Sequence, residues 1–352
     1  MQKPTVLLVA NFLNGNRANP SVSGELALKL TAAGWQISTT SHVPHRLPRL
    51  LDMILTVWSR RQRYAVAHVE VYSGLAFIWA ELVCLALWLA GKPYVLSLHG
   101  GGLPVFARRW PGRVRCLLRS ARAVTVPSAY LMDAMSAYRA DLRLLPNPVD
   151  VETYHFRLRT RPEPSLVWLR AFHHIYNPVL AVHVVASLVR EFPDVRLTMI
   201  GPDRGDGSLQ AAVRASADLG VVDRITFVGP VPKRDVPSWL NTGDIFLNTT
   251  NVDNTPISVI EAMACGLCVV STDVGGVRYL LDHGHNALLV PPADPERFAL
   301  AIQRIVTEYG LAQGLSRHAR WKAEQFSWTD TLPAWERLLT DVAKGSGGRG
   351  HA

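Results

Sequence analysis

The stretch DIFLNTTNVDNTPISVIEAMACGLCVVSTD, residues 244–273, contains two short apolar runs separated by a segment of helix length. The runs DIFLNTT and LCVVSTD have the length of buried strands, and ISVIEAMACG is expected to form a helix that ends at Gly266. A strand, a helix and a second strand in this order predict two parallel strands joined by a right-handed crossover. This stretch therefore indicates the α/β class.

The same alternation continues on both sides of this stretch. The apolar runs TVLLVANF, AVAHVEV and PYVLSLHGG alternate with helical patterns early in the chain, and SLVWLRAF, VRLTMIG and RITFVG do so later. Between these parts, LPNPVDVETYHFRLRTRPEPS has prolines and charges without an apolar period, which is typical of a domain boundary. We predict two doubly wound, Rossmann-like domains with parallel sheets.

The domain boundaries are predicted from this break. We expect an N-terminal domain over 1–150, a linker over 151–164, a C-terminal domain over 165–325, a helix over 326–343 that packs back on the N-terminal domain, and a disordered tail over 344–352. The carboxyl ends of both sheets are expected to meet at a shared cleft, because open α/β sheets bind ligands at these ends. Functional residues should therefore lie in loops that follow strands.

The composition suits globular domains. Hydrophobic residues make up 48% and charged residues 18% of the chain, which is ample for buried cores. The net charge of +9 attracts anionic partners and leaves nucleic acid, phosphorylated substrates and anionic lipid open. The four cysteines lack the grouping of a metal site, so we interpret the C-x-x-C pair Cys265 and Cys268 as structural and the protein as cytoplasmic.

The most apolar segment is LAFIWAELVCLALWLAG, which starts at Leu75. It contains Glu81, and Gly74 and Gly91 limit it to less than the length of a bilayer crossing. We therefore expect a buried helix rather than a membrane-spanning one.

Two carboxylates in the opening stretch, Asp253 and Glu261, are candidates for a binding site. Pro256 suits the first turn of the following helix, whose free N–H groups and dipole could bind an anion. Glu261, one to two turns into this helix, could accept hydrogen bonds from ligand hydroxyls. The alternative is that Asp253 or Asn254 caps the helix and that Glu261 is a solvated helix residue.

The segment DNTPISVIEAMACG resembles the Glu-x7-Glu signature of retaining glycosyltransferases of family 4, whose usual form is E-G-F/L-P-x-x-x-x-E-A-M-A-x-G. The family has a strand and Gly-Gly after this signature, and CVVSTD and VGG occupy those places here. The resemblance extends over most of the chain through LALKLTAAGW, LHGG, VPS, LPNPVD, DRITFVGPV, DIFLNTT and FSWTD, in the same order. It implies the GT-B fold, in which two Rossmann-like domains face each other across a cleft.

The resemblance also implies roles for individual residues. Glu261 would bind the ribose hydroxyls of a nucleotide-sugar. Asp253 stands where the family has the first Glu, which reaches the hydroxyls of the donor sugar, and its shorter side chain implies a different sugar selectivity. Backbone groups of the connecting segment would contact the same sugar and the diphosphate, namely those of Asn254, Thr255, Pro256 and Ile257.

The diphosphate calls for fixed cations when no metal takes part. The family supplies an Arg and a Lys spaced as in G-R-L-x-x-x-K-G, and Arg170 matches the Arg. No lysine follows, because Tyr176, Asn177 and Pro178 stand near its place. Four residues are candidates for the second cation: His173, His174, Lys233 and Arg234.

Two glycine-containing loops of the N-terminal domain are further candidates. His99 ends a predicted strand and is followed by three glycines, and the family has a His here that contacts the donor sugar near the reacting carbon. Gly100 would allow the backbone to approach the ligand closely. In the loop after the first strand, Gly15 resembles a family glycine under the donor phosphates, and Asn16 and Arg17 are candidate acceptor contacts.

The arginine-rich stretch over 106–122 contains Phe106, Trp110 and Leu117 among its basic residues. Such a stretch suits a surface helix in contact with the anionic inner face of a membrane, and equally a solvated helix face. Nucleic acid is not expected as a partner, because no nucleic-acid motif accompanies the charge.

The predicted function is a retaining glycosyltransferase that moves a hexose-type sugar from a UDP- or GDP-sugar to a hydroxyl of a glycan or lipid-linked acceptor, in cell-surface polysaccharide or glycolipid synthesis. No metal or other cofactor is expected, since the cations above would stabilise the leaving diphosphate. A nucleotide-sugar epimerase of the same fold, and a binding protein with impaired catalysis, remain alternatives.

Overall fold

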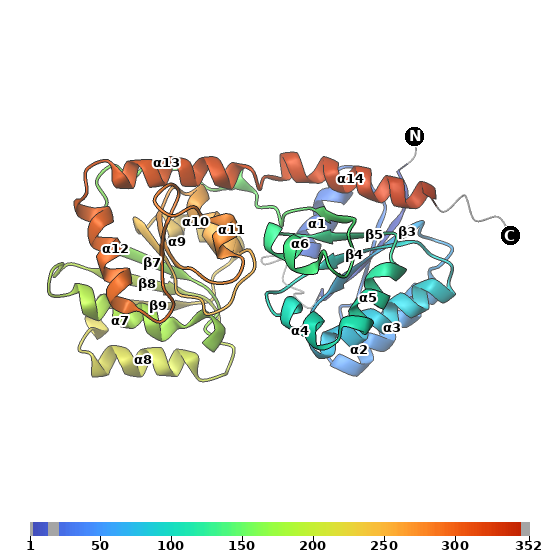
Figure 1. Ribbon diagram of the computed structural model, residues 1–352, viewed down its shortest axis with the longest axis horizontal. Coiled ribbons are helices and arrows are strands. Elements are labelled where there is room, and N and C mark those ends of the chain that lie inside the picture. The colour runs from blue at the N-terminus through green and yellow to red at the C-terminus, as the bar shows by residue number, and fades with distance from the viewer. Residues whose placement is uncertain (1–2, 13–20, 346–352) are drawn as a thin grey trace. The chain divides into compact units, whose positions relative to one another are not determined.

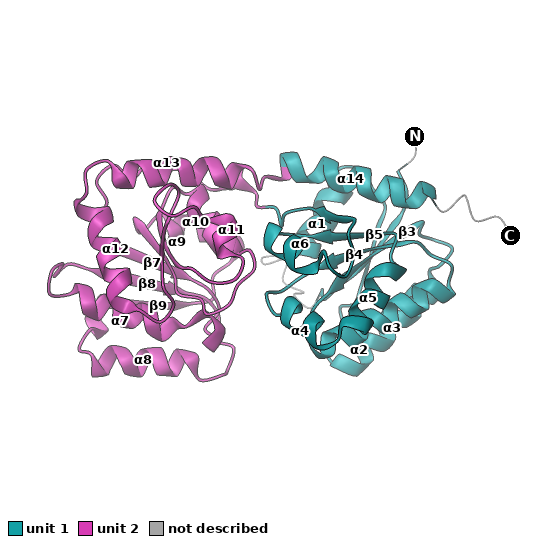
Figure 2. Cartoon of the chain, in the orientation of Figure 1, with its two compact units in different colours: residues 1–148, 329–352 teal, residues 149–328 magenta. Residues whose placement is uncertain are grey.

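The computed structural model describes residues 3–12 and 21–345. The chain forms two compact units, shown in separate colours in Figure 2. Unit 1 comprises Met1–Pro148 and Thr329–Ala352, and unit 2 comprises Val149–Trp328. The tail beyond residue 345 and the glycine loop with Gly15, Asn16 and Arg17 lie outside the described residues.

Unit 1 contains a six-stranded parallel sheet in the order β2-β1-β3-β4-β5-β6. Its strands are β1 (Val6–Val9), β2 (Ile37–Thr40), β3 (Val66–Val71), β4 (Tyr94–Leu98), β5 (Ala123–Val126) and β6 (Leu142–Leu144). Its helices are α1 (Val22–Ala32), α2 (Arg46–Ser59), α3 (Leu75–Leu89), α4 (Leu103–Arg109), α5 (Pro111–Ser120), α6 (Ala129–Met135) and α14 (Trp328–Lys344). The strand order reverses at β1 and β3, which is where doubly wound sheets bind ligands.

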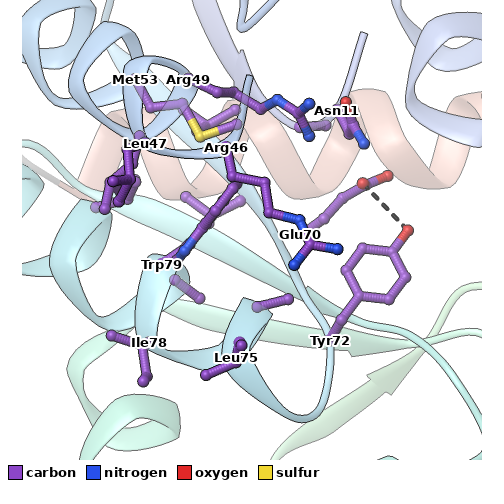
Figure 3. A pocket seen from close by; sticks show the side chains of 17 residues that line it. Asn11, Arg46, Leu47, Arg49, Met53, Glu70, Tyr72, Leu75, Ile78 and Trp79 are labelled. Atoms are coloured by element: carbon purple, nitrogen blue, oxygen red, sulfur yellow. Dashed lines mark hydrogen bonds between the residues drawn. The ribbon is translucent and has the colours of Figure 1, made fainter. Parts of the chain in front are cut away.

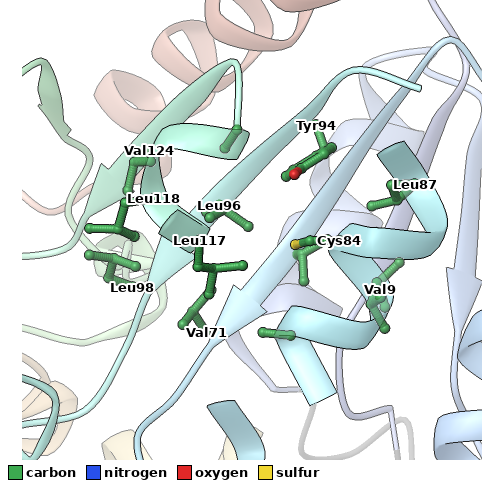
Figure 4. Packing of buried hydrophobic residues seen from close by; sticks show 14 of the residues in the cluster. Val9, Val71, Cys84, Leu87, Tyr94, Leu96, Leu98, Leu117, Leu118 and Val124 are labelled. Atoms are coloured by element: carbon green, nitrogen blue, oxygen red, sulfur yellow. The ribbon is translucent and has the colours of Figure 1, made fainter. Parts of the chain in front are cut away.

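Helices cover both faces of this sheet (Figure 1). On one face, α2 to α6 pack on the strands around a core that includes Val9, Leu96 and Val124 (Figure 4). On the other face lies α14, whose Trp335 contacts the ring of His68 at 5.2 Å between centroids. Glu336 of the same helix accepts a hydrogen bond of 2.7 Å from the indole of Trp35. These contacts attach the C-terminal helix to unit 1.

The apolar helix α3 is buried on the side that meets the core, but the other side is exposed, which the sequence did not indicate. Phe77, Val83 and Leu87 pack into the core of unit 1, but Leu85 and Trp88 are exposed. The sequence is apolar on both sides of the helix, and only one side meets the sheet. In the described part of the chain, no helix has the length and apolar character required to cross a membrane.

Unit 2 contains a second six-stranded parallel sheet, in the order β12-β11-β10-β7-β8-β9. Its strands are β7 (Ser165–Leu169), β8 (Arg196–Ile200), β9 (Ile225–Gly229), β10 (Ile245–Asn248), β11 (Cys268–Thr272) and β12 (Leu288–Val290). Its α-helices are α7 (Pro178–Leu188), α8 (Ser208–Asp218), α9 (Val236–Leu240), α10 (Ile257–Ala264), α11 (Val277–Leu280), α12 (Pro295–Thr307) and α13 (Leu311–Glu324). Short 3-10 turns are η1 (Val151–Thr153), η2 (His174–Tyr176), η3 (Val222–Arg224) and η4 (Lys233–Asp235). The predicted α/β class and the two doubly wound sheets are confirmed.

The opening stretch of the sequence forms β10, α10 and β11 in the core of unit 2. The two strands pair in parallel, with Ile245 opposite Cys268. Cys265 and Cys268 are buried free thiols, and burial raises the pKa of each to about 12. Both thiols therefore stay protonated at neutral pH, which supports a structural role.

The first segment of unit 2, which follows Pro148, packs on the rest of that unit. Arg159 is buried and donates hydrogen bonds to the carbonyl oxygens of Cys265 and Gly243. Close to it in sequence, the amide of Val149 donates to the carbonyl of Phe326 at 2.8 Å. The two segments of the chain that connect the units, near Val149 and near Phe326, are therefore hydrogen-bonded to each other.

Candidate functional site

In unit 2, the candidate residues come from loops at the carboxyl ends of parallel strands. Arg170 follows β7, the loop with Asp253 follows β10, and Lys233 lies in η4 after β9. Glu261 belongs to α10, which begins directly after the Asp253 loop. Because parallel strands end at the same edge of a sheet, residues far apart in the sequence meet here.

Arg170 and Asp253 form an ion pair in a mostly buried setting, with side chains that are 14% and 13% exposed. The guanidinium carbon of Arg170 lies 4.2 Å from the centre of the Tyr176 ring. Burial lowers the pKa of Arg170, while Tyr176 and Glu261 oppose this shift. Its Nε is buried and has no hydrogen-bond partner among the described residues. A buried donor of this kind is suited to an anionic ligand.

Glu261 is buried, at 3% exposure, and its Oε1 has two partners. The hydroxyl of Tyr154 donates a hydrogen bond of 2.9 Å to this oxygen, and Lys233 forms an ion pair with it. The interpretation of Glu261 as a solvated helix residue is therefore wrong. Neither Asp253 nor Asn254 caps α10, because the N-cap position is Pro256 and no side chain caps it.

The Gly-Gly pair after β11 holds the Asp253 loop in place. The amide of Gly276 donates to the carbonyl of Asp253 at 3.0 Å. A Cβ on Gly276 would lie 2.0 Å from the carbonyl oxygen of Asn254, and one on Gly275 would lie 2.4 Å from that of Asp253. Only glycine leaves room for the loop at these two positions.

We expect Gly276→Ala to destabilise unit 2 by about 1–3 kcal/mol, because the added methyl group forces the Asn254 backbone to move. Gly314→Ala is the control, since Gly314 lies inside α13 and has nothing within 4 Å of its Cβ position. Alanine should stabilise that helix by about 0.5–1 kcal/mol. Chemical denaturation of the two variants measures both effects, and equal unfolding free energies would contradict this role of Gly276.

Tyr176, one of the residues near the expected place of the family's lysine, lies against Arg170. Of the four candidate cations, Lys233 alone forms an ion pair with a residue of the Glu-x7-Glu pattern in the described part of the chain. Arg234 is exposed and its nearest acid is Asp235 at 3.6 Å. His174 Nδ1 lies 3.1 Å from the carboxylate of Asp206.

His173, His174 and Asp206 also form the one group in the described residues whose ligand atoms are close enough for a metal ion, within 4.8 Å of one another. Asp206 already accepts hydrogen bonds from the amides of His174 and Ser208, at 2.8 and 3.1 Å. The bond from His174 is the main reason for the lowered pKa of Asp206. These bonds give Asp206 a structural role in fixing the η2 turn.

In unit 1, His99 follows β4 and belongs to a cluster that sequence reasoning missed. Its ring stacks on Tyr72 at 5.2 Å, and its Nε2 lies 3.9 Å from Glu70, which ends β3 with Val71. Tyr72 donates a hydrogen bond of 3.2 Å to Glu70. Burial lowers the pKa of His99, against the opposing effect of Glu70. The signal in the sequence that could have revealed this cluster is Glu70, a carboxylate near the end of β3, the strand that pairs with β4 before His99.

The remaining candidates from the sequence are Gly100 and the arginine-rich stretch over 106–122, and both lie in unit 1. Gly100 has a φ of 85°, a left-handed conformation that favours glycine. The arginine-rich stretch forms two helices, α4 and α5, rather than one, and the break falls at Trp110 and Pro111. Leu117 is buried, and Arg113 pairs with Glu81 of α3.

Comparison with known families and proteins shows clear similarity. The family model Glycosyl transferases group 1 matches residues 163–308, and Glycosyltransferase Family 4 matches residues 21–153. The chain is 27% identical over 286 residues to a D-inositol 3-phosphate glycosyltransferase of Frankia alni, covering 72% of this chain and 70% of that protein. It is 28% identical over 294 residues to one of Paenarthrobacter aurescens, covering 76% and 71%.

Solved structures share the fold. Sucrose-phosphate synthase from Thermosynechococcus elongatus has a TM-score of 0.79 at 18% identity, over 97% of this chain and 100% of that one. Anabaena HepE in complex with UDP and glucose has a TM-score of 0.75 at 16% identity, over 95% and 99%. With both halves of the chain matched by models of one family, the protein belongs to the family 4 (group 1) glycosyltransferases and has their GT-B fold.

Proposed function

We propose that this glycosyltransferase transfers a hexose-type sugar from a UDP- or GDP-sugar to a hydroxyl of a glycan or lipid-linked acceptor, with retention of the anomeric configuration, in cell-surface polysaccharide or glycolipid synthesis. One observation carries this proposal. The two acids of the Glu-x7-Glu pattern, Asp253 and Glu261, are each paired with a cation from another part of unit 2, Arg170 and Lys233. Two acids for hydroxyls and two cations for phosphates are the groups that a nucleotide-sugar requires.

The donor would bind by exchanging partners within this set. Glu261 is held by Tyr154, so it can keep its position and accept hydrogen bonds from the ribose hydroxyls. Lys233 is then able to turn from Glu261 to the diphosphate and to act as the cation missing after Arg170. Asp253, oriented by Arg170, accepts hydrogen bonds from the sugar, while the uncapped first turn of α10 directs N–H groups toward the phosphates.

The proposed reaction is a front-face displacement. The bond from the anomeric carbon to the diphosphate oxygen breaks, the acceptor oxygen bonds to the same face of that carbon, and the acceptor proton passes to the departing phosphate oxygen. Arg170 and Lys233 stabilise the charge that develops on the diphosphate. Retaining glycosidases use one of two close carboxylates as a nucleophile. Here both carboxylates are engaged by cations, which supports a binding role for them.

The compared proteins support a nucleotide-sugar donor. HepE of Anabaena is solved with UDP-glucose, and the D-inositol 3-phosphate glycosyltransferases are named for a glycosyl acceptor. A thermal-shift screen with UDP-, GDP- and ADP-sugars tests the proposal. A donor at 100 times its Kd should stabilise the protein by about 2.7 kcal/mol. No shift with any of the three nucleotides would count against it.

Asp253 is the position at which we expect the sugar preference to be decided. Asp253→Glu restores the family's residue and moves the carboxylate outward by one methylene, so the ranking of different sugars on the same nucleotide should change. The affinity for the free nucleoside diphosphate should change less than the sugar ranking, because Glu261 and Lys233 are untouched and Arg170 keeps an acidic partner. Competition assays with a series of nucleotide-sugars measure both, and an unchanged sugar ranking would refute this role.

A further inference from the structure

A pocket of 910 Å³ lies in unit 1 between α2 and α3 at the ends of β1 and β3. This volume is within the range of about 300–1,000 Å³ found for small-molecule sites. Its lining is divided (Figure 3): Leu47, Leu75, Ile78 and Trp79 form an apolar end, and Asn11, Arg46, Glu70 and Tyr72 gather at a polar end. A ligand that fits both ends has a hydrocarbon chain and a polar head.

The polar end adjoins the cluster around His99. Glu70 and Tyr72 line the pocket, and the same two side chains contact His99 through the 3.9 Å approach and the stacked ring described above. Arg46 is exposed and, within the described part of the chain, makes no hydrogen bond or ion pair. Its guanidinium is thus available for an anionic head group.

The same two helices present an outer apolar face, which we define by Leu51, Leu55 and Trp58 of α2 and Leu82, Leu85 and Trp88 of α3. All six side chains are exposed, at spacings of three and four residues that place them on one side of each helix. The helices contact each other and pack on one face of the sheet, and Leu85 and Trp88 lie on the side of α3 toward α5, beside Arg113 and Cys116. Several large apolar side chains exposed on two neighbouring helices are typical of an interaction site.

Basic residues lie at one end of the outer apolar face. Arg61 lies over the ring of Trp58 at 4.9 Å, and Arg60 and Arg63 are its neighbours at the end of α2. The acids of the two helices are already engaged: Asp52 accepts a hydrogen bond from Thr40, and Glu81 pairs with Arg113. Aromatic and aliphatic side chains bordered by arginines match the interface of an anionic bilayer.

We propose that the acceptor is an anionic lipid. Its hydrocarbon chain lies in the pocket between α2 and α3, and its head group lies at Arg46, Glu70 and Tyr72. The outer apolar face contacts the membrane that holds this lipid. This inference rests on the proposed function and names its acceptor class. It places the head group beside His99 within unit 1. It also accounts for the apolar character of α3 on the side away from the sheet.

Calorimetric titration with dodecyl phosphate, below the concentration at which it forms micelles, tests the pocket. Ala76→Trp fills the pocket from an exposed lining position and should weaken dodecyl phosphate binding by roughly tenfold or more, through lost burial of the chain. Arg46→Glu should weaken dodecyl phosphate but not uncharged dodecyl maltoside. Equal affinity of wild type and Ala76→Trp for dodecyl phosphate would overturn the proposal.

Co-sedimentation with phosphatidylcholine vesicles that contain phosphatidylglycerol tests the outer apolar face. Leu55→Glu should reduce vesicle binding by roughly tenfold. Leu28→Glu is a matched control, because Leu28 is 63% exposed and Leu55 65%, and Leu28 lies on α1 outside the core shared by α2 and α3. Equal vesicle binding of the two variants would contradict the proposal. It would also be contradicted if the protein formed dimers without binding vesicles and Leu55→Glu dissociated these dimers, because the face would then join two copies of the chain.

The donor thermal shift, measured on the same preparations, separates the two proposals. A nucleotide-sugar shift without dodecyl phosphate or vesicle binding refutes the lipid acceptor alone. Lipid binding without any nucleotide-sugar shift refutes the proposed function, and with it the role of this lipid as an acceptor.

Discussion

Arg170→Gln is expected to lower kcat by about 10²–10³-fold, the cost of removing one preorganised group from a developing oxyanion. Arg170 is the buried cation beside Asp253, and its Nε is the donor without a partner in the described chain. The negative charge that Arg170 would stabilise develops on the diphosphate as it leaves, so kcat should fall more than the donor affinity. Steady-state kinetics with the donor found by the thermal-shift screen measure this.

The control must separate catalysis from stability, because Arg170→Gln leaves Asp253 buried without its partner. The double variant Arg170→Gln with Asp253→Asn removes both charges and should recover the thermal stability without the activity. Arg170→Lys keeps the charge and loses the planar fork that stacks on Tyr176, so its kcat should lie between those of the wild type and Arg170→Gln. A fully active Arg170→Gln would exclude Arg170 from the phosphate site.

Glu261→Gln has the second large expected effect, a loss of donor affinity by about 10–100-fold. This range corresponds to the 1.5–3 kcal/mol of a hydrogen bond to a charged group. The amide is isosteric but neutral, and it leaves Lys233 without its anionic partner. Calorimetric titration with the free nucleoside diphosphate and with the nucleotide-sugar should show the same loss, because the ribose is common to both ligands.

Tyr154→Phe provides the comparison for Glu261→Gln. It removes the hydroxyl that holds Glu261 but keeps the carboxylate that would bind the ribose, so the donor affinity should fall by less than in Glu261→Gln. A Glu261→Gln variant that binds the nucleoside diphosphate as the wild type does would show that this buried carboxylate serves the fold alone.

The sequence predicted those features that depend on local pattern. Apolar runs of strand length that alternate with helices predicted both sheets, and the spacing of Asp253 and Glu261 in a strand, loop and helix pointed to the candidate site. The Gly-Gly pair was part of the matched pattern, but the sequence did not show why glycine is required there. The steric reason is the close packing of Gly276 on the backbone of Asn254.

Features that depend on contacts across the chain were not predictable from the pattern. Lys233 and Tyr154 meet Glu261 from positions 28 and 107 residues away, and no local signal connects them. Glu70 joins His99 because β3 and β4 are neighbours in the sheet. The outward side of α3 was misjudged because apolar composition alone does not tell which side of a helix meets the sheet.

The anomeric configuration of the first-formed sugar tests the central claim most directly. Proton NMR of the slow transfer of the donor sugar to water, recorded before the free sugar mutarotates, requires no knowledge of the acceptor. A donor with an α-linked sugar should release the α anomer, because a front-face displacement at a site whose carboxylates bind rather than attack keeps the configuration. Release of the β anomer would show inversion and would contradict the account.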